Sequence, residues 1–332
     1  MSDTPLIRVT SLKKSFDTKN SGLVSAIRKT NQKVYAVDDV SFDLNKGEIL
    51  GLIGESGCGK STTAKLLLKL LRPDDGTILY KGNDITFLNR KQLADYRCKA
   101  QIIFQDPFEY LNPRMNVLDA VAEPLVINKL VSKQDRKNIV IEYLELVGIS
   151  PAASYLYRFP HEMSGGQRQR IAIARALVMK PEFIVADEPT SMLDVSVRAG
   201  ILNLLRELKK KLGVSMVFIT HDLTTAGYMC DRIAVMYKGR IVETGSRNDV
   251  MFAPQHPYSK ALVGVATDLS AFLSGKDKHL KDGEVNSYEQ IMNCPFESRC
   301  LHFDSTCTSE SSAAMYEHTP GHYVACCKCN SI

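Results

Sequence analysis

A glycine-rich segment with one lysine and one serine, GESGCGKS at residues 54–61, has the most specific chemistry in the chain. Its glycines let the backbone curl so that successive N–H groups point to one spot, and a helix starting there adds its positive dipole end. Lys60 would contact the β- and γ-phosphates of a nucleotide, and the Ser61 hydroxyl would bind Mg²⁺. The residues predicted to bind ATP here are Gly54, Glu55, Ser56, Gly57, Cys58, Gly59, Lys60, Ser61 and Thr62.

Two adjacent carboxylates, Asp187 and Glu188, close the apolar segment that begins at Phe183. Asp187 would hold the Mg²⁺ through its water shell, and Glu188 would polarise an attacking water. Adjacent acids alone are more often a solvated strand end. Because they are paired with a phosphate loop, the interpretation is phosphoryl transfer from ATP to water.

A second anion site opens a later amphipathic segment, where the Ser164 side chain and the N–H groups of Gly165 and Gly166 precede Gln167. One nucleotide does not need two such sites. With Met163 before it and the letters RQR after it, the segment resembles the signature sequence of ABC transporter ATPases. In that family two subunits face each other head to tail, and each signature contacts the γ-phosphate held by its partner. The resemblance therefore implies a homologous partner subunit.

The same resemblance implies roles for further residues. Gln105 would contact Mg²⁺ and water, His221 would contact the γ-phosphate, and Asp194 in the segment SMLD would lie at the seam between subunits. Adenine needs an aromatic face for stacking. Phe16 occupies the position of the family's aromatic loop and is the predicted ring, with Tyr35 as the alternative.

The elements that must position these residues follow from hydrophobic periodicity. Apolar segments predict strands at residues 6–12, 37–44, 49–54, 102–104, 183–187, 214–220 and 232–242. Amphipathic segments near the 3.6-residue period predict helices at residues 60–71, 136–148, 165–178 and 197–213. Buried strands alternating with helices indicate a mostly parallel sheet and an α/β fold. The first, second and last strands are expected to form a separate β-rich layer.

The resemblance then implies a P-loop NTPase fold of the ABC ATPase type. It would have a β-rich subdomain, an α-helical subdomain at about residues 106–160 and a small cysteine-containing C-terminal extension. Residues 1–250 would form the nucleotide-binding domain and residues 251–332 the extension. A chain of 332 residues, 44% of them hydrophobic, is long enough to bury such a core.

Composition and charge argue against several classes of protein. The net charge of +5 is spread along the sequence and lacks the concentrated basic face of a nucleic-acid-binding protein. The first residues lack the layout of a secretory leader, and no apolar run approaches the roughly 18 residues of a membrane helix. We therefore expect a peripheral subunit at the cytoplasmic face of the cell membrane, with no nucleic-acid partner.

The segments GRIVETG at residues 239–245 and PQHPY at residues 254–258 narrow the resemblance. They are similar to the region after the ATPase core in dipeptide and oligopeptide importers and their nickel-importing relatives. Together with FQDPFEYLNPRMNV, they resemble the second of the two ATPase subunits in these permeases. This implies ATP-driven import of dipeptides or oligopeptides, with nickel left open. The implied partners are a different ATPase subunit in a heterodimer, two membrane permease subunits and an extracytoplasmic substrate-binding protein.

Six of the nine cysteines crowd the last 39 residues. Packed cysteines in a reducing compartment indicate metal ligation before disulfides. Members of the family often carry the spacing C-x5-C-x6-C-x18-C, and in some it holds an iron–sulfur cluster. The resemblance therefore predicts a [4Fe–4S] cluster, with Zn²⁺ or unliganded thiols as alternatives and with Cys327 or Cys329 able to replace the fourth ligand. The predicted ligands are Cys294, Cys300, Cys307 and Cys326.

Overall fold

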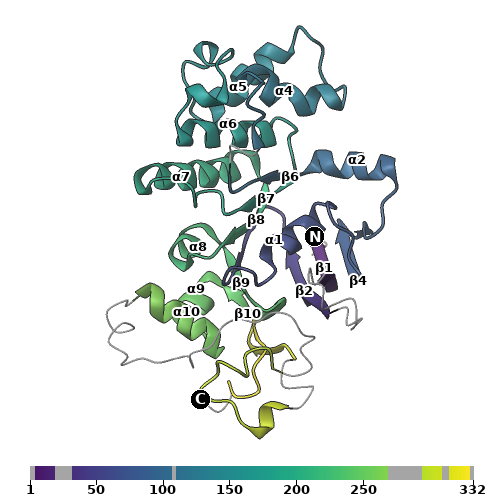
Figure 1. The fold of residues 1–332 in the computed structure, drawn as a ribbon, viewed down its shortest axis with the longest axis vertical. Helices are drawn as coiled ribbons and strands as arrows, with labels where there is room; N and C mark the ends of the chain where they lie inside the picture. The colour runs from purple at the N-terminus through teal and green to yellow at the C-terminus, as the bar shows by residue number, and fades with distance from the viewer. Residues whose placement is uncertain (1–3, 19–31, 107–109, 268–293, 309–313, 330–332) are drawn as a thin grey trace, which may run out of the picture. The chain divides into compact units, whose positions relative to one another are not determined.

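The structure is a computed structural model, and it describes residues 4–18, 32–106, 110–267, 294–308 and 314–329. Backbone contacts divide the chain into two compact units. Residues 1–87 and 219–332 form the first unit, so it holds both the purple start and the yellow end of the chain in Figure 1. Residues 88–218 form the second unit.

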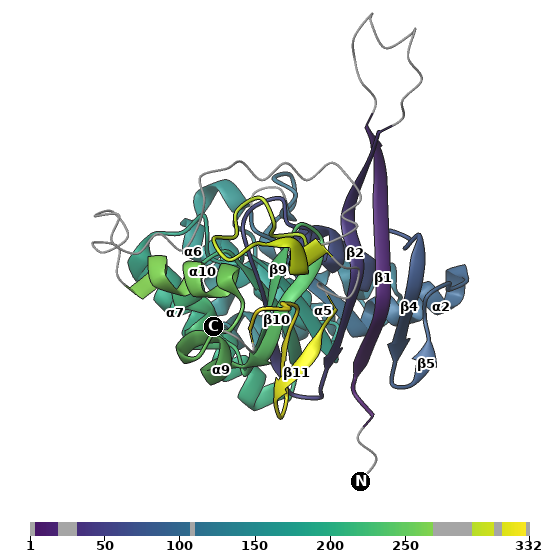
Figure 2. The ribbon, with the colours of Figure 1, turned by 90° about the horizontal axis from the view of Figure 1, so that it is seen from below.

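The first unit contains an antiparallel sheet of β1 Ile7–Thr18, β2 Gln32–Leu44, β4 Asp75–Tyr80 and β5 Asn83–Asp84. The strand order is β2-β1-β4-β5, and Figure 2 shows β1 and β2 as one long ribbon. Leu12 and Val40 pair across this ribbon and are both fully buried. The strands predicted from residues 6–12 and 37–44 are therefore confirmed as parts of a β-rich sheet.

A second group of strands in the first unit is formed by β3 Ile49–Ile53, β9 Arg232–Tyr237, β10 Arg240–Ser246, β11 Tyr316–Thr319 and β12 His322–Val324. β9 is parallel to β3, β10 returns antiparallel to β9, and β12 and β11 continue the sheet beside β10 (Figure 2). The expectation that residues 232–242 belong to the β-rich layer is wrong. Every residue of β9 after the first is buried, as a strand covered on both faces requires.

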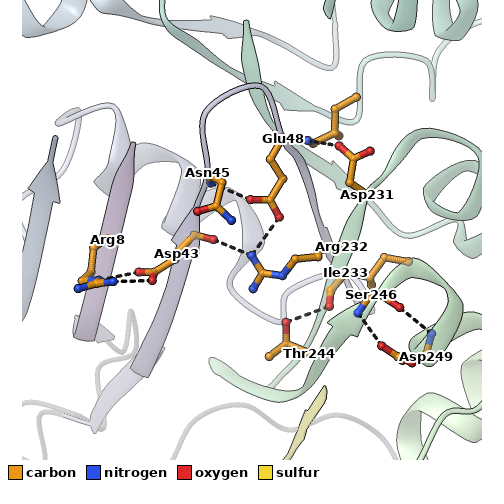
Figure 3. Close-up of polar contacts among 11 residues, drawn as sticks. Arg8, Asp43, Asn45, Glu48, Asp231, Arg232, Ile233, Thr244, Ser246 and Asp249 are labelled. Carbon is orange, nitrogen blue, oxygen red and sulfur yellow. Dashed lines mark hydrogen bonds and ion pairs between the residues drawn. The ribbon is translucent and has the colours of Figure 1, made fainter. Parts of the chain in front are cut away.

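Polar contacts hold the start of β3 (Figure 3). The Ile49 N–H donates to the Asp231 carboxylate at 2.8 Å. Arg232 Nη1 donates to Glu48 Oε1 at 2.9 Å and to the Asp43 carbonyl at 3.3 Å. Glu48 is buried, and a buried carboxylate needs such a partner. These contacts fix the first residue of β3 beside the start of β9, and β3 then leads into the loop GESGCGKS.

The helices of the first unit are α1 Lys60–Leu67, α8 Leu223–Met229, α9 Arg247–Phe252 and α10 Pro257–Thr267, with a short 3₁₀ helix, η3, at Ser305–Thr308. Side chains fix where some of them begin. The Asp222 carboxylate accepts the Thr224 N–H at 2.9 Å at the start of α8, an N-cap that satisfies a free donor of the first turn. Among the described residues, none of the helices has the length and apolar character needed to cross a bilayer.

The second unit contains the strands β6 Ala100–Ile103, β7 Phe183–Asp187 and most of β8 Ser215–Thr220, the helices α2 Arg90–Lys99, α4 Val117–Ile127, α5 Arg136–Leu146, α6 Gly165–Leu177 and α7 Val195–Leu212, and the 3₁₀ helices η1 Ala152–Ser154 and η2 Pro160–Glu162. α4 and α5 pack against α6 (Figure 1). α7 buries one stripe, which includes Ile201, Leu205 and Leu208, and ends at Gly213 in the left-handed conformation. The α/β class is confirmed.

Candidate nucleotide-binding site

The segment GESGCGKS joins the buried strand β3 to α1, as the pattern requires. Gly54 and Glu55 begin the loop, and Lys60 is the first residue of the helix. Gly54 and Gly59 have positive φ angles of 153° and 105°. A Cβ on either residue would lie 2.1 Å from a backbone carbonyl oxygen, that of Met236 or Ala36. Both positions therefore need glycine, because the neighbouring strands approach the loop backbone so closely.

Lys60 lies inside the curl of the loop and is 5% exposed. Its Nζ donates to the carbonyl oxygens of Gly54 and Glu55, both at 2.8 Å. Ser56 and Ser61 are exposed on the same loop, so an anion can reach the backbone around them. The loop therefore combines a buried ammonium group with an accessible helix start, which suits a phosphate chain.

Cys58 lies between the two glycines at positions 57 and 59. Its side chain is buried, and burial raises the pKa of its thiol, so the sulfur is neutral at pH 7. The Cys58 carbonyl accepts the Gly239 N–H at 2.9 Å. The side chain of Cys58 is therefore part of the packing that supports the loop, and only its backbone is available for a ligand.

Asp187 ends β7, and Glu188 follows in the left-handed region at φ 45°. This conformation costs a non-glycine residue about 1 kcal/mol. The Glu188 carbonyl accepts the Ser191 N–H at 3.2 Å and the Ser191 hydroxyl at 3.1 Å. Ser191 therefore holds Glu188 in its strained conformation. Sequence reasoning missed this role, although a serine three residues on is a common turn signal.

Gln105 belongs to the same edge of the sheet as the acidic pair. β6 and β7 are parallel, with Ile103 opposite Ala186. Gln105 follows β6 by two residues and is exposed. Because the carboxyl ends of parallel neighbours meet at one edge, β6 and β7 bring Gln105, Asp187 and Glu188 to that edge.

The signature segment begins α6 with reciprocal caps. The Gln167 N–H donates to Ser164 Oγ at 3.3 Å, and the Ser164 N–H donates to Gln167 Oε1 at 3.0 Å. A Cβ on Gly166 would lie 2.5 Å from Val197 in α7, and one on Gly165 would lie 3.4 Å from Leu193. Packing within the second unit therefore requires glycine at position 166, whereas a Cβ on Gly165 would make only an ordinary contact.

Asp194 and His221 each occupy an exposed turn. Asp194 precedes α7, and its carbonyl accepts the Arg198 N–H at 2.8 Å. His221 follows β8, between Thr220 and Asp222, where the Asp222 N–H donates to Thr220 Oγ1 at 3.0 Å. These local contacts fix the backbone on which each predicted side chain stands.

Phe16 and Tyr35 face opposite sides of the β1–β2 ribbon. Phe16 pairs with Val34, and Ser15 pairs with Tyr35, and cross-strand partners share a face. The Phe16 ring is 40% exposed, with Lys14 Nζ 5.7 Å from its centroid. Tyr35 is half-buried. A single adenine ring can therefore stack on Phe16 or on Tyr35 but not on both.

Comparison with known proteins decides the family. The ABC transporter family pattern matches residues 37–191, and the pattern of the oligopeptide/dipeptide transporter C-terminal region matches residues 242–307. Dipeptide transport ATP-binding protein DppF of Haemophilus influenzae is 42% identical over 325 residues, which cover 98% of this chain and 97% of that protein. The chain belongs to the ABC transporter family.

Further relatives agree with this assignment. Oligopeptide transport ATP-binding protein OppF of Bacillus subtilis is 51% identical over 232 residues, covering 69% of this chain and 75% of that protein. A solved dimeric ATP-binding cassette, MJ0796, bound to ADP and Pi matches with a TM-score of 0.63 and 27% identity, over 73% of this chain and 98% of that one. cbiO1 from Clostridium perfringens, part of an ABC transporter complex, matches with a TM-score of 0.64 and 26% identity, over 82% and 100%. The predicted ABC ATPase fold is confirmed.

The prediction of a [4Fe–4S] cluster in this ABC transporter chain is wrong. Cys294, Cys300, Cys307 and Cys326 all lie in described segments. Within those segments, no group of three or more histidine, cysteine, aspartate or glutamate side chains could hold a metal ion. The relatives are named simply as transport ATP-binding proteins. The zinc alternative finds no support in the same thiols.

Protein contacts hold the C-terminal region in place of a metal. The Phe296 ring is buried, with its centroid 5.2 Å from that of Tyr237 and 5.6 Å from that of Tyr258. The sulfurs of Cys307 and Cys327 lie 3.4 Å apart. A metal is expected where a short segment cannot fold alone, but this one shares the core of the first unit and adds strands to its sheet.

A buried carboxylate organises the region matched by the peptide-transporter pattern. Glu243 in β10 is fully buried and accepts the N–H groups of Gln255 and His256 at 2.8 and 3.0 Å. Its Oε1 also lies 2.7 Å from His322 Nε2 in β12. His256 is itself buried, and its Nδ1 accepts the Tyr258 N–H at 3.1 Å. His256 therefore has an acceptor role that its neutral form fulfils.

We expect His256 to make the chain less stable in acid. Burial lowers the pKa of His256 from 6.5 to about 4. Between these values the unfolded chain binds a proton that the folded chain does not, so stability falls as the pH is lowered from 6.5 towards 4, by up to about 3 kcal/mol. The free energy of unfolding would be measured across this pH window in wild type and in His256→Asn, whose amide oxygen can replace Nδ1 as acceptor. Its dependence on pH should correspond to about one fewer bound proton in the variant. Equal slopes in both proteins would remove His256 as the cause.

The adenine ring is expected to stack on Phe16. Phe16→Ala should weaken ATP binding by about three- to tenfold, because an aromatic stacking partner is lost. Fluorescence titration with ATP would measure this, with Tyr35→Ala as the matched control on the opposite face of the ribbon. Normal affinity in Phe16→Ala together with weakened affinity in Tyr35→Ala would assign the ring to Tyr35.

Proposed function

We propose that this chain binds and hydrolyses ATP to drive the import of dipeptides or oligopeptides across the cell membrane. One observation carries the proposal. A single chain joins a phosphate loop between β3 and α1 to the oligopeptide/dipeptide transporter C-terminal region at residues 242–307. Relatives that align over nearly the whole chain are named as dipeptide and peptide import ATP-binding proteins, which supports the same function here.

The loop residues would bind the phosphates of ATP. Lys60 would exchange the carbonyls of Gly54 and Glu55 for the β- and γ-phosphate oxygens, while the backbone N–H groups around Ser61 and Thr62 would receive the remaining charge. The exposure of Ser56 and Ser61 supports this, because the ligand needs access to the outer side of the loop.

The residues present also suit Mg²⁺, whose role is to neutralise charge that develops on the phosphates. Ser61, Gln105 and Asp187 offer the hydroxyl, amide and carboxylate oxygens that this ion prefers. Glu188 would take a proton from the attacking water, and His221 would donate a hydrogen bond to the γ-phosphate. The left-handed backbone of Glu188 keeps its carboxylate at the end of β7 before any ligand binds.

The signature would act on a nucleotide held by a partner subunit. Ser164, Gly165, Gly166 and Gln167 form a preorganised helix start, and exposed apolar side chains flank Asp194. Met192 and Val195 are 63% and 81% exposed, which suits a surface that a second ATPase subunit covers. We infer a heterodimer with a homologous subunit, in which closure of the dimer on ATP changes the direction that the permease faces.

We infer the remaining assembly from the same transporter type. Two membrane permease subunits would carry the substrate path, and an extracytoplasmic binding protein would deliver the peptide. The chain would lie at the cytoplasmic face of the membrane as a peripheral subunit. Residues 1–250 would serve as the nucleotide-binding domain, with a helical part at about residues 106–160 that transmits motion to the permeases, and residues 251–332 would serve as the extension.

Co-purification of this chain with its permease and ATPase partners tests the proposal. The complex in detergent should hydrolyse ATP, and peptide-loaded binding protein should raise the rate several-fold. The rate would be measured as phosphate release with and without peptide. Stimulation by nickel in the absence of any response to peptides would overturn the proposed substrate class.

A further inference from the structure

Glu55, the second residue of the phosphate loop, is held by two residues from the far end of the sequence. The Glu55 N–H donates to the Tyr258 hydroxyl at 3.0 Å. Arg299 Nη1 donates to both Glu55 carboxylate oxygens, at 3.0 and 2.9 Å. Tyr258 and Arg299 belong to the C-terminal part of the first unit, 203 and 244 residues away in sequence.

Every polar group of Glu55 is therefore engaged. Its carbonyl accepts Lys60 Nζ at 2.8 Å, so Glu55 links the lysine of the loop to the C-terminal residues. The carboxylate is 32% exposed, whereas the Arg299 side chain is 12% exposed. A pair that is partly shielded from water in this way is stronger than a surface ion pair.

The two holding residues are themselves fixed by packing. Tyr258 is fully buried, and its ring centroid lies 4.6 Å from that of Tyr237. Phe296, three residues before Arg299, packs on both tyrosines, and its carbonyl accepts the Arg299 N–H at 3.1 Å. Aromatic side chains with few rotatable bonds lose little freedom on packing, so they make a rigid support.

The positive charge of Arg299 affects how an anionic ligand binds to the loop. Without Arg299, the Glu55 carboxylate would stand beside the phosphate site as an uncompensated negative charge and repel the phosphates. With Arg299, that charge is neutralised, and the loop keeps the shape in which Lys60 lies at its centre.

We propose that Tyr258 and Arg299 are positioning residues for nucleotide binding, acting through Glu55. The proposal rests on the role of residues 54–61 as the phosphate loop. The C-terminal region would then contribute to nucleotide binding without contacting ATP. Substitutions in that region would change the affinity for ATP.

A double-mutant cycle tests this on the purified full-length chain with ATP as the probe. Arg299→Gln should raise the dissociation constant of ATP about tenfold, because it leaves Glu55 uncompensated. Glu55→Gln removes that repulsion, so adding Arg299→Gln to it should change the constant less than about twofold. Equal weakening in both backgrounds, or no weakening in either, would overturn the proposal.

Three further variants separate positioning from folding. Tyr258→Phe keeps the buried ring and removes only the hydroxyl, and it should weaken ATP binding about threefold while the melting temperature without nucleotide changes little. Arg299→Lys keeps the charge without the planar fork and should fall between wild type and Arg299→Gln. Lys328→Gln, which breaks the ion pair with Asp304 in the same region, should bind ATP normally. If Lys328→Gln weakens ATP binding as much as Arg299→Gln does, the effect is a general loosening of the region and the proposal fails.

A wrong assignment of residues 54–61 as the phosphate loop would give a different result from a wrong assignment of Tyr258 and Arg299. In the first case Lys60→Ala would leave ATP binding unchanged. If Lys60→Ala abolishes binding while the Arg299 and Tyr258 variants bind normally, the loop assignment stands and only the positioning role is lost.

Discussion

Glu188→Gln is expected to bind ATP with normal affinity and to hydrolyse it at least about 100-fold more slowly. The amide keeps the size and position of the carboxylate at the end of β7 but cannot take a proton from water. Phosphate release at saturating ATP, together with an ATP titration, separates the two effects. Because Glu188 stands in a left-handed conformation held by Ser191, the isosteric change leaves the backbone as it is.

Glu182→Gln is the matched control for this change. Glu182 precedes the other end of the same strand, and its carbonyl accepts the Ser215 N–H at 3.1 Å. The variant should therefore turn over ATP as the wild type does. Near-normal turnover in Glu188→Gln would remove Glu188 as the catalytic carboxylate.

Lys60→Ala is expected to reduce ATP affinity by more than about 100-fold. The side chain supplies a buried ammonium group at the centre of the loop, and a charge-assisted contact with phosphate is among the stronger polar interactions. Equilibrium binding of ATP with Mg²⁺ would measure the loss. Lys65→Ala is the control, since Lys65 is an exposed lysine on the same helix, and it should bind ATP normally. Equal affinities in the two variants would contradict the assignment of Lys60.

The sequence was most informative where chemistry forces a local arrangement. A loop that must approach Met236 and Ala36 within van der Waals distance needs glycine at positions 54 and 59, so the pattern is visible without a structure. The cap formed by Ser164 and Gln167 is equally local, because both partners lie within one turn of α6. Both patterns could be recognised because their own residues are close together in sequence, whereas the strands that approach Gly54 and Gly59 could not be read from it.

Features that depend on distant residues could not be predicted. Residues 232–242 read as part of a β-rich layer because an apolar run does not reveal its partner strand, and only pairing with β3 places β9 in the other sheet. The contact of Arg299 with Glu55 joins positions 244 apart and leaves no local signal. The cysteine spacing was misleading for a related reason, since it says nothing of the core that Phe296 shares with Tyr237.

The C-terminal extension is stabilised by the sheet of the first unit. β11 and β12 are short strands that no periodicity criterion would detect, with four and three residues. They are stable because β12 pairs with β10, which is already part of a buried sheet. Tyr258 and Arg299, which contact Glu55 in the phosphate loop, both lie in the segment matched by the oligopeptide/dipeptide transporter C-terminal pattern.

Uptake of labelled peptide by the complete transporter tests the central claim most directly. The complex would be reconstituted in lipid vesicles with ATP on the side of this chain and binding protein on the other. Labelled dipeptide, oligopeptide and nickel would be offered in parallel, with Glu188→Gln as the inactive control. We predict ATP-dependent accumulation of peptide that the Glu188→Gln variant abolishes. Accumulation of nickel without peptide, or peptide uptake that persists in the Glu188→Gln complex, would contradict the account.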